Sequence, residues 1–301
     1  MNSKMMFRAV VLIGVLLMSA ARPATAQQPR TVFLILMENQ NWSFIKGNPG
    51  AWYINHSLLP MASYAEQYYN PPGLHPSEPN YLWLEAGTAF GIHDDFDPVR
   101  NHQKTANHLT AQLEAAGISW RAYAEGISGK DCPLVSFGVY AAKHNPFVFF
   151  DDVTENNLRS SRNCIEHIRP YAELENGTVA RYNFITPDEC HDMHSVAGCK
   201  SGSRIANGDA WLSEQIPKIL ASSAYQNGGV LIITWDEAIV GDGPIGMIVL
   251  SPDAKGNGYH NDIHYTHSST LRTLQELFGV QPLLGDAANA IDLSDLFRTF
   301  P

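Results

Sequence analysis

The chain has 301 residues, of which 45% are hydrophobic and 17% are charged, a composition typical of a folded globular protein. Twenty basic and thirty acidic residues give a net charge of −10. Because nucleic-acid backbones are bound by patches of Lys and Arg, this acidic balance argues against nucleic acid as a ligand.

The first 26 residues have the layout of a secretory signal peptide. Lys4 and Arg8 precede an apolar run over 9–20, and 24–26 (ATA) form a small-x-small cleavage site. The run is short for a bilayer span, so an uncleaved anchor is the weaker interpretation. Cleavage would remove three basic residues and no acidic one, leaving a charge of −13. We expect a secreted or periplasmic protein, monomeric and not stably inserted in a membrane.

The order of predicted elements indicates an α/β fold with a mostly parallel central sheet flanked by helices. Apolar runs predict strands at 31–37, 118–124, 182–185, 229–234 and 246–251. Helical spacing predicts helices at 58–69, 104–116, 209–222 and 269–278. The stretch 126–170 is less periodic and is interpreted as an insertion over one edge of the sheet. Residues 27–301 are expected to form one domain.

The four cysteines all lie in the part of the chain that would be exported. An even number of cysteines in an exported protein predicts two disulfides. Of the three possible pairings, proximity in the chain favours Cys132–Cys164 and Cys190–Cys199. A zinc site is disfavoured because no C-x-x-C pair is present.

Polar and acidic side chains follow the predicted strands, where ligands bind in parallel sheets. These residues are Glu38 and Asn39 after the first strand, the DECHDMH segment 188–194 after 182–185, and Asp236 and Glu237 after 229–234. Three histidines, His260, His264 and His267, precede the last long helix. Carboxylates and imidazoles that converge on one edge could bind a divalent cation.

A serine precedes a short apolar helix in the segment 75–81 (HPSEPNY). Ser77 would lie beside free backbone N–H groups at the start of that helix, a geometry that suits a phosphate oxyanion. A plain helix N-cap is the alternative interpretation of Ser77.

The chain resembles the phosphoesterase family of secreted acid phosphatases and phosphatidylcholine-type phospholipases C, within the alkaline phosphatase superfamily. The motifs that carry the resemblance are 38–39 (EN), 75–81 (HPSEPNY), 120–125 (WRAYAE), 143–147 (KHNPF), 188–194 (DECHDMH), 208–212 (GDAWL), 233–237 (ITWDE) and 266–279 (THSSTLRTLQELFG). They follow the family's order over 32–279, and the acid phosphatase branch, with its phosphoinositide phosphatases, is the more similar. The resemblance implies an alkaline-phosphatase-like three-layer sandwich and a single phosphoesterase catalytic domain over 27–301.

The resemblance also implies a role for each site residue. Ser77 is the expected nucleophile, forming a phosphoserine, while Asn39 and Asn80 are expected to contact the phosphate. The expected metal ligands are Glu38, Asp192, Asp236 and Glu237. His194 and His267 are expected to bind the phosphoryl oxygens or a metal, or to protonate the leaving alcohol. Asp188 and His191 are alternatives to Asp192 and His194, because sequence spacing does not choose between them.

The acidic pair Asp236-Glu237 stands where many superfamily members have Asp-His, which favours Mg, Ca or Mn over Zn. The expected substrate is a small phosphate ester or a phospholipid head group, phosphoinositides included. A phospholipase C-like phosphodiesterase is the near alternative, and a non-catalytic binding protein on the same scaffold is a further one. Lone histidines are more often structural, so His75, His93 and His144 stay outside the predicted site.

Overall fold

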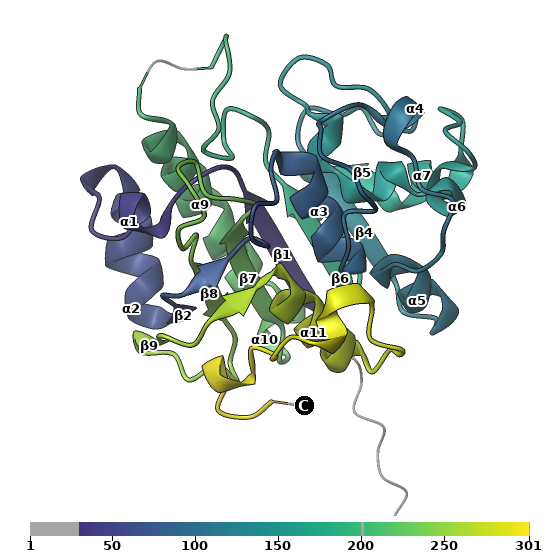
Figure 1. The fold of residues 1–301 in the computed structure, drawn as a ribbon. Helices are drawn as coiled ribbons and strands as arrows, with labels where there is room; N and C mark the ends of the chain where they lie inside the picture. The colour runs from purple at the N-terminus through teal and green to yellow at the C-terminus, as the bar shows by residue number, and fades with distance from the viewer. Residues whose placement is uncertain (1–29, 200–201, 301) are drawn as a thin grey trace, which may run out of the picture.

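A computed structural model describes residues 30–199 and 202–300, and an eight-stranded sheet runs through its centre (Figure 1). The strand order is β5-β4-β6-β1-β7-β8-β2-β9. The strands are β1 (Val32–Met37), β2 (Ser63–Ala65), β4 (Trp120–Ala124), β5 (Ile168–Pro170), β6 (Tyr182–Thr186), β7 (Val230–Trp235), β8 (Met247–Leu250) and β9 (Tyr259–Asn261). β8 is antiparallel to both of its neighbours, and the other pairs are parallel. The predicted mostly parallel sheet is therefore confirmed.

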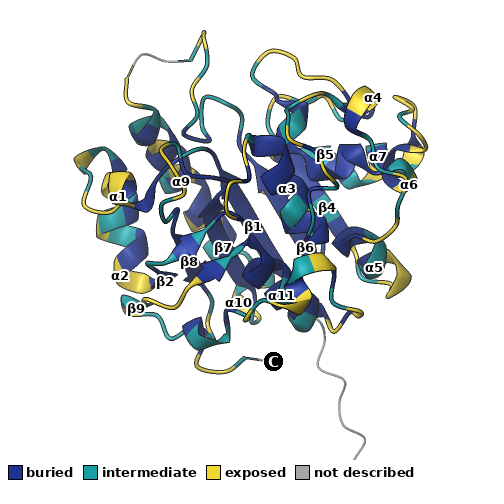
Figure 2. Ribbon diagram, in the orientation of Figure 1, coloured by how far each residue is buried: buried dark blue, intermediate teal, exposed yellow. Residues whose placement is uncertain are grey.

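The sheet is built around β1 and β7, which pair in parallel over six residues each. Every residue of both strands is buried, in the sequences VFLILM and VLIITW. Strands covered on both faces need such continuous apolar runs, which is why these two segments were the strongest strand predictions. In Figure 2 the central strands are uniformly buried, and exposed residues lie in the surrounding loops and helix ends.

Helices cover both faces of the sheet, as a three-layer sandwich requires. α3 (Ser77–Ala86), α5 (Leu109–Ala115) and α11 (His267–Phe278) pack together on one face, and α9 (Arg204–Ala221) lies on the other (Figure 1). The shorter helices are α1 (Trp42–Ile45), α2 (Leu59–Met61), α4 (Pro98–Asn101), α6 (Asp151–Thr154), α7 (Arg162–His167), α8 (Tyr171–Glu175) and α10 (Ser223–Gln226). A two-stranded parallel sheet pairs β3 (Tyr68–Tyr69) with β10 (Tyr265–Thr266).

Two helix predictions were wrong in extent. The predicted helix 58–69 ends at Met61, because 63–65 instead form β2 between β8 and β9. Tertiary strand pairing overrides local spacing there. The predicted helix 104–116 begins only at Leu109, where the His108 side chain accepts the Ala111 N–H and caps the helix. The irregular stretch 126–170 supplies α6, α7 and the edge strand β5.

Both predicted disulfides, Cys132–Cys164 and Cys190–Cys199, are present. The predicted signal peptide lies outside the described residues. Among the residues that are described, no helix is both long and apolar enough to cross a bilayer.

Candidate active site

Backbone hydrogen bonds bring three acidic residues together where β1, β6 and β7 end. The Glu38 N–H donates to the Asp192 carbonyl at 2.7 Å, and the Asp236 N–H donates to the Met37 carbonyl at 2.9 Å. The Asn39 N–H donates to Asp236 Oδ1 at 2.8 Å. The main chain therefore fixes the separation of Glu38, Asp192 and Asp236. We call these three side chains the central carboxylate cluster.

Ser77 lies against this cluster at the start of α3. It is the first residue of the helix, and Pro76 occupies the N-cap position, so the alternative interpretation of Ser77 as an N-cap is wrong. The Ser77 hydroxyl donates to Glu38 Oε2 at 3.1 Å. One turn later, the Tyr81 hydroxyl donates to Glu38 Oε1 at 2.7 Å. Ser77 and Tyr81 are both buried, so α3 presents a hydroxyl directly to a buried carboxylate.

The electrostatics of the central carboxylate cluster favour a bound cation. Burial raises the pKa of Glu38, Asp192 and Asp236 above the ordinary range, to about 7 for Asp236, and neighbouring carboxylates raise these pKa values further. Asp192 Oδ2 and Asp236 Oδ2 are buried without a hydrogen-bond partner. Unpaired buried carboxylate oxygens are costly, so these residues fit an oxygen-seeking divalent ion.

Glu237 is held by hydrogen bonds to the predicted phosphate-binding residues. Asn39 Nδ2 donates to Glu237 Oε1 at 2.7 Å, and Asn80 Nδ2 donates to Oε2 at 3.2 Å. His75 Nδ1 lies 2.5 Å from the same Oε2, and its Nε2 lies 3.1 Å from Asp242 Oδ1. Both amides therefore position Glu237 in this structure, and their contact with phosphate stays a prediction. Sequence reasoning missed His75, although it opens the HPSEPNY motif.

His144 also belongs to the site, although it was predicted to be structural. Its Nε2 lies 3.1 Å from Glu38 Oε1 without hydrogen-bond alignment, and its Nδ1 lies 3.6 Å from Asp192 Oδ2. The buried ring stacks on Tyr81 with 5.2 Å between centroids. Burial lowers the pKa of His144, so the imidazole is neutral beside the carboxylates. The signal that could have found it was the KHNPF motif.

The structure separates the two predicted catalytic histidines. The half-buried His194 donates its backbone N–H to Asp192 Oδ1 at 2.7 Å, and its Nδ1 is buried without a partner. His267 instead has partners at both ring nitrogens, the Asp236 carbonyl at 2.5 Å and the Tyr68 hydroxyl at 3.0 Å. In this structure His267 therefore supports the backbone of Asp236, and its role toward a phosphoryl oxygen or a metal stays a prediction.

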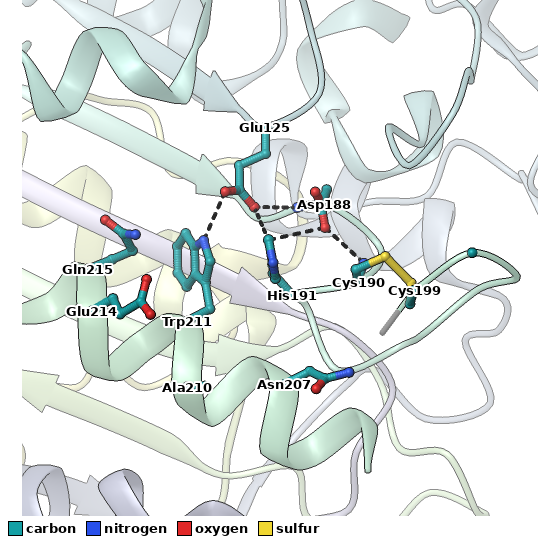
Figure 3. Close-up of a pocket in the computed structure, with 11 residues that line it drawn as sticks. Glu125, Asp188, Cys190, His191, Cys199, Asn207, Ala210, Trp211, Glu214 and Gln215 are labelled. Carbon is teal, nitrogen blue, oxygen red and sulfur yellow. Dashed lines mark hydrogen bonds and ion pairs between the residues drawn. A yellow bond between two sulfur atoms is a disulfide. The ribbon is translucent and has the colours of Figure 1, made fainter. Parts of the chain in front are cut away.

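Asp188 and His191 lie on the other side of the same loop, in a second cluster with Glu125 (Figure 3). His191 Nδ1 lies 2.8 Å from Glu125 Oε2 and 3.3 Å from Asp188 Oδ1. Trp211 Nε1 donates to Glu125 Oε1 at 3.0 Å. In 30–199 and 202–300, these are the three His, Cys, Asp or Glu residues whose ligand atoms all lie within 4.8 Å of one another. They line a cavity of about 440 Å³ beside the Cys190–Cys199 disulfide.

The GDAWL motif is structural. A Cβ on Gly208 would lie 2.4 Å from Met193 Cγ, so glycine is needed where α9 packs against the loop that carries Asp192. Asp209 accepts the backbone N–H groups of Tyr53 and Ile54, each at 2.8 Å. The motif therefore positions the loop 188–194, and its Trp211 contacts the second cluster. His260 and His264 pack on Tyr64 and Tyr69 with centroid distances of 4.9 and 4.7 Å.

The fold is that of the alkaline phosphatase superfamily. A protein of that superfamily from Vibrio parahaemolyticus superposes with a TM-score of 0.59 at 11% identity, over 90% of this chain and 72% of the other. Phosphonate monoester hydrolase of Agrobacterium radiobacter superposes with a TM-score of 0.58 at 11% identity, over 89% and 77%. The Phosphoesterase family model matches residues 61–281, and the chain belongs to this family.

Relatives in sequence agree with this family. Phosphatidylinositol-3-phosphatase of Mycobacterium tuberculosis is 30% identical, over 97% of this chain and 94% of its own length. Phosphate-repressible acid phosphatase of Penicillium chrysogenum is 28% identical, over 70% of this chain and 51% of its own length. Acid phosphatase of Aspergillus niger is 30% identical, over 70% and 50%, so the chain spans about half of each fungal relative. The protein is a hydrolase that acts on phosphoric ester bonds.

Proposed function

We propose that the protein is a metal-dependent phosphomonoesterase that works through a phosphoserine on Ser77. The observation that carries the proposal is the Ser77 hydroxyl, hydrogen-bonded at 3.1 Å to Glu38 in the central carboxylate cluster and placed at the N-terminus of α3. The predicted set of free N–H groups is not present there, because the Glu78 N–H donates to Asp95 and Pro79 has no N–H; the dipole of α3 still favours the negative charge of a phosphoryl group.

Glu38, Asp192 and Asp236 would hold the divalent ion, with Glu237 beside them. The bound ion would supply positive charge that favours ionised Ser77 and the charge that builds on the phosphoryl oxygens. Carboxylate ligands favour Mg, Ca or Mn over Zn. The two buried carboxylate oxygens without partners, Asp192 Oδ2 and Asp236 Oδ2, support this assignment.

The reaction would have two steps. Ser77 Oγ passes its proton to Glu38 Oε2, which accepts its hydrogen bond, and bonds to phosphorus; the bond from phosphorus to the alcohol oxygen breaks, and the alcohol leaves with a proton. His194, whose Nδ1 has no protein partner, is the proposed group that relays a proton to the alcohol; partial burial lowers its pKa, so the imidazole would be neutral until it accepts that proton. Water then attacks the phosphoserine, releasing inorganic phosphate and restoring the Ser77 hydroxyl.

The relatives support a phosphate monoester as substrate. The acid phosphatase of Aspergillus niger matches 70% of this chain, and the phosphatidylinositol-3-phosphatase of Mycobacterium tuberculosis matches 97% of it. We therefore propose phosphate monoesters, inositol phospholipid head groups among them. We further propose that residues 1–26 direct export of one domain over 27–301. Two disulfides support an oxidising compartment as its destination.

Ser77→Ala tests the nucleophile. We expect turnover of p-nitrophenyl phosphate to fall by at least ~10³-fold, because an alanine has no oxygen to attack phosphorus. Acid quenching of the wild-type protein during turnover should trap phosphoserine at Ser77, located by tandem mass spectrometry. Ser213→Ala on α9 is the matched control and should keep wild-type turnover. A Ser77→Ala variant that folds normally and turns over at the wild-type rate would contradict the proposal.

A further inference from the structure

Lys143 is the residue of the KHNPF motif that the proposed function leaves without a role. It lies in the short 3₁₀ helix 142–144, next to His144. Its side chain is 19% exposed, and its Nζ lies 2.8 Å from Asp95 Oδ2. Burial of a lysine is unfavourable unless its charge has a use or a partner. The surroundings of this ammonium group therefore indicate what it does.

Asp95 connects Lys143 to the helix that carries the nucleophile. Its second oxygen, Oδ1, accepts the Glu78 N–H at 3.0 Å, in the first turn of α3. One carboxylate thus holds both the ammonium group of Lys143 and the residue that follows Ser77. Asp95 thereby ties the ammonium group of Lys143 to the first turn of the helix that begins with Ser77.

The charge of Lys143 acts on the central carboxylate cluster. Lys143 lowers the pKa of Glu38, against the larger effect of burial, and Glu38 and Asp236 in turn favour the charged form of Lys143. Lys143 also lowers the pKa of His144 and of the half-buried His194. The ammonium group therefore lies within electrostatic reach of both carboxylates and both histidines that surround Ser77.

We propose that Lys143 binds a non-bridging oxygen of the phosphoryl group at Ser77 and selects phosphate monoesters over diesters. This inference rests on the proposed function, and it names the residue that sets the substrate class. A monoester carries two negative charges near neutral pH and a diester carries one. A largely buried ammonium group tied to the first turn of the helix that carries the nucleophile is worth more to the dianion, because fixed charges act strongly where water is mostly excluded.

The test compares Lys143→Gln with Lys143→Arg, in protein loaded with divalent metal. The matched control is Lys218→Gln, which removes an ion-paired lysine, 2.7 Å from Glu175, at the far end of α9. The substrates are p-nitrophenyl phosphate and bis-p-nitrophenyl phosphate. For Lys143→Gln we expect kcat/KM to fall by about 10²–10³-fold on the monoester and much less on the diester. Lys143→Arg should recover part of the monoester preference. Lys218→Gln should leave kcat/KM unchanged on both substrates.

A binding measurement makes the test independent of turnover. Calorimetric titration with inorganic phosphate should show an affinity that weakens by at least ~10-fold in Lys143→Gln and is unchanged in Lys218→Gln. Equal losses on both substrates would overturn the inference, because they would show that Lys143 only positions α3. Unchanged phosphate affinity, or a wild-type protein that prefers the diester, would also overturn it. Whether monoester turnover depends on Ser77 is a separate question, which belongs to the proposed function. The Ser77→Ala variant answers it.

Discussion

Two clusters of acidic side chains lie at the same edge of the sheet, and they differ in how far hydrogen bonds and ion pairs within the protein compensate their carboxylates. Glu125, Asp188 and His191 pair with one another, and Glu125 also accepts hydrogen bonds from Trp211 and from the Asp188 N–H. His191 helps to lower the pKa of Glu125. In the central carboxylate cluster, by contrast, two buried oxygens have no hydrogen-bond partner and all three pKa values are raised.

We propose that uncompensated buried carboxylates are a better guide to a cation site than close spacing of ligand types. The Glu125 cluster has the tighter geometry, but its own imidazole already faces both carboxylates. The central cluster is fully buried, and the imidazole that faces two of its carboxylates, His144, has a pKa lowered by burial and an Nε2 without a hydrogen-bond partner. Three predictions, in order of expected effect, test whether this distinction holds.

The largest effect is expected from removing a carboxylate of the central cluster. Asp236→Asn should lose the bound divalent ion and reduce kcat/KM on p-nitrophenyl phosphate by about 10²–10³-fold or more, because an amide cannot replace the charge. Elemental analysis after dialysis measures the metal. Asp188→Asn is the matched control and should keep the metal. If Asp188→Asn lost the metal and Asp236→Asn kept it, the cation would belong to the Glu125 cluster instead of the central one.

A smaller effect is expected in the stability of metal-free protein. A carboxyl whose pKa is raised in the folded state holds its proton after the unfolded chain has lost it, so stability falls as pH rises. The window runs from the ordinary carboxyl range up to about 7, the folded pKa of Asp236. The slope should approach about 1.4 kcal/mol per pH unit for each carboxyl involved.

Chemical denaturation in EDTA at several pH values between the two ends of this window measures that slope. Added Mn²⁺ should raise the stability most at the upper end, because the ionised carboxylates bind it. Asp236→Asn should flatten the slope in EDTA, since the asparagine does not titrate. Stability that rises with pH across the same window would show that these carboxyls are ionised without a cation.

The smallest effect is expected from Glu125→Gln. The amide can still accept the Trp211 N–H, but the charge-assisted contact with His191 is lost. We expect the free energy of unfolding to fall by about 1–3 kcal/mol, with metal content and turnover close to wild type. Loss of metal in this variant would place a cation in the Glu125 cluster and not only in the central one.

Much of the fold, and several residues of the candidate site, could be predicted from the sequence. Buried strands such as β1 and β7 correspond to continuous apolar runs in the sequence, and Glu38 and Asp236 follow them directly. Contacts that depend on chain segments far apart were harder. His144 and Lys143 lie in a short 3₁₀ helix that no periodicity marks, and they reach Glu38 and Asp95 across the fold.

His267 shows what a motif alone does not give, the direction of a side chain. Its motif suggested a role at the phosphate, yet the direction of its ring is set by the start of α11, which aims it at the Asp236 carbonyl and Tyr68. The choice between Asp188 and Asp192 was likewise open, because both follow β6 within a few residues. In the structure Asp192 lies in the central carboxylate cluster and Asp188 beside Glu125, on a loop that packs closely against α9 at Gly208.

The Cys190–Cys199 disulfide closes a ring of chain that contains both Asp192 and His194. The sheet can form from its apolar strands without this bond, but the ring then gains conformational freedom that the folded loop must give up. With Cys190 and Cys199 reduced, the protein would thus have a formed sheet but a more flexible loop around Asp192 and His194. Oxidation of this one pair of thiols therefore restricts the segment that carries two residues of the candidate site, in addition to stabilising the fold.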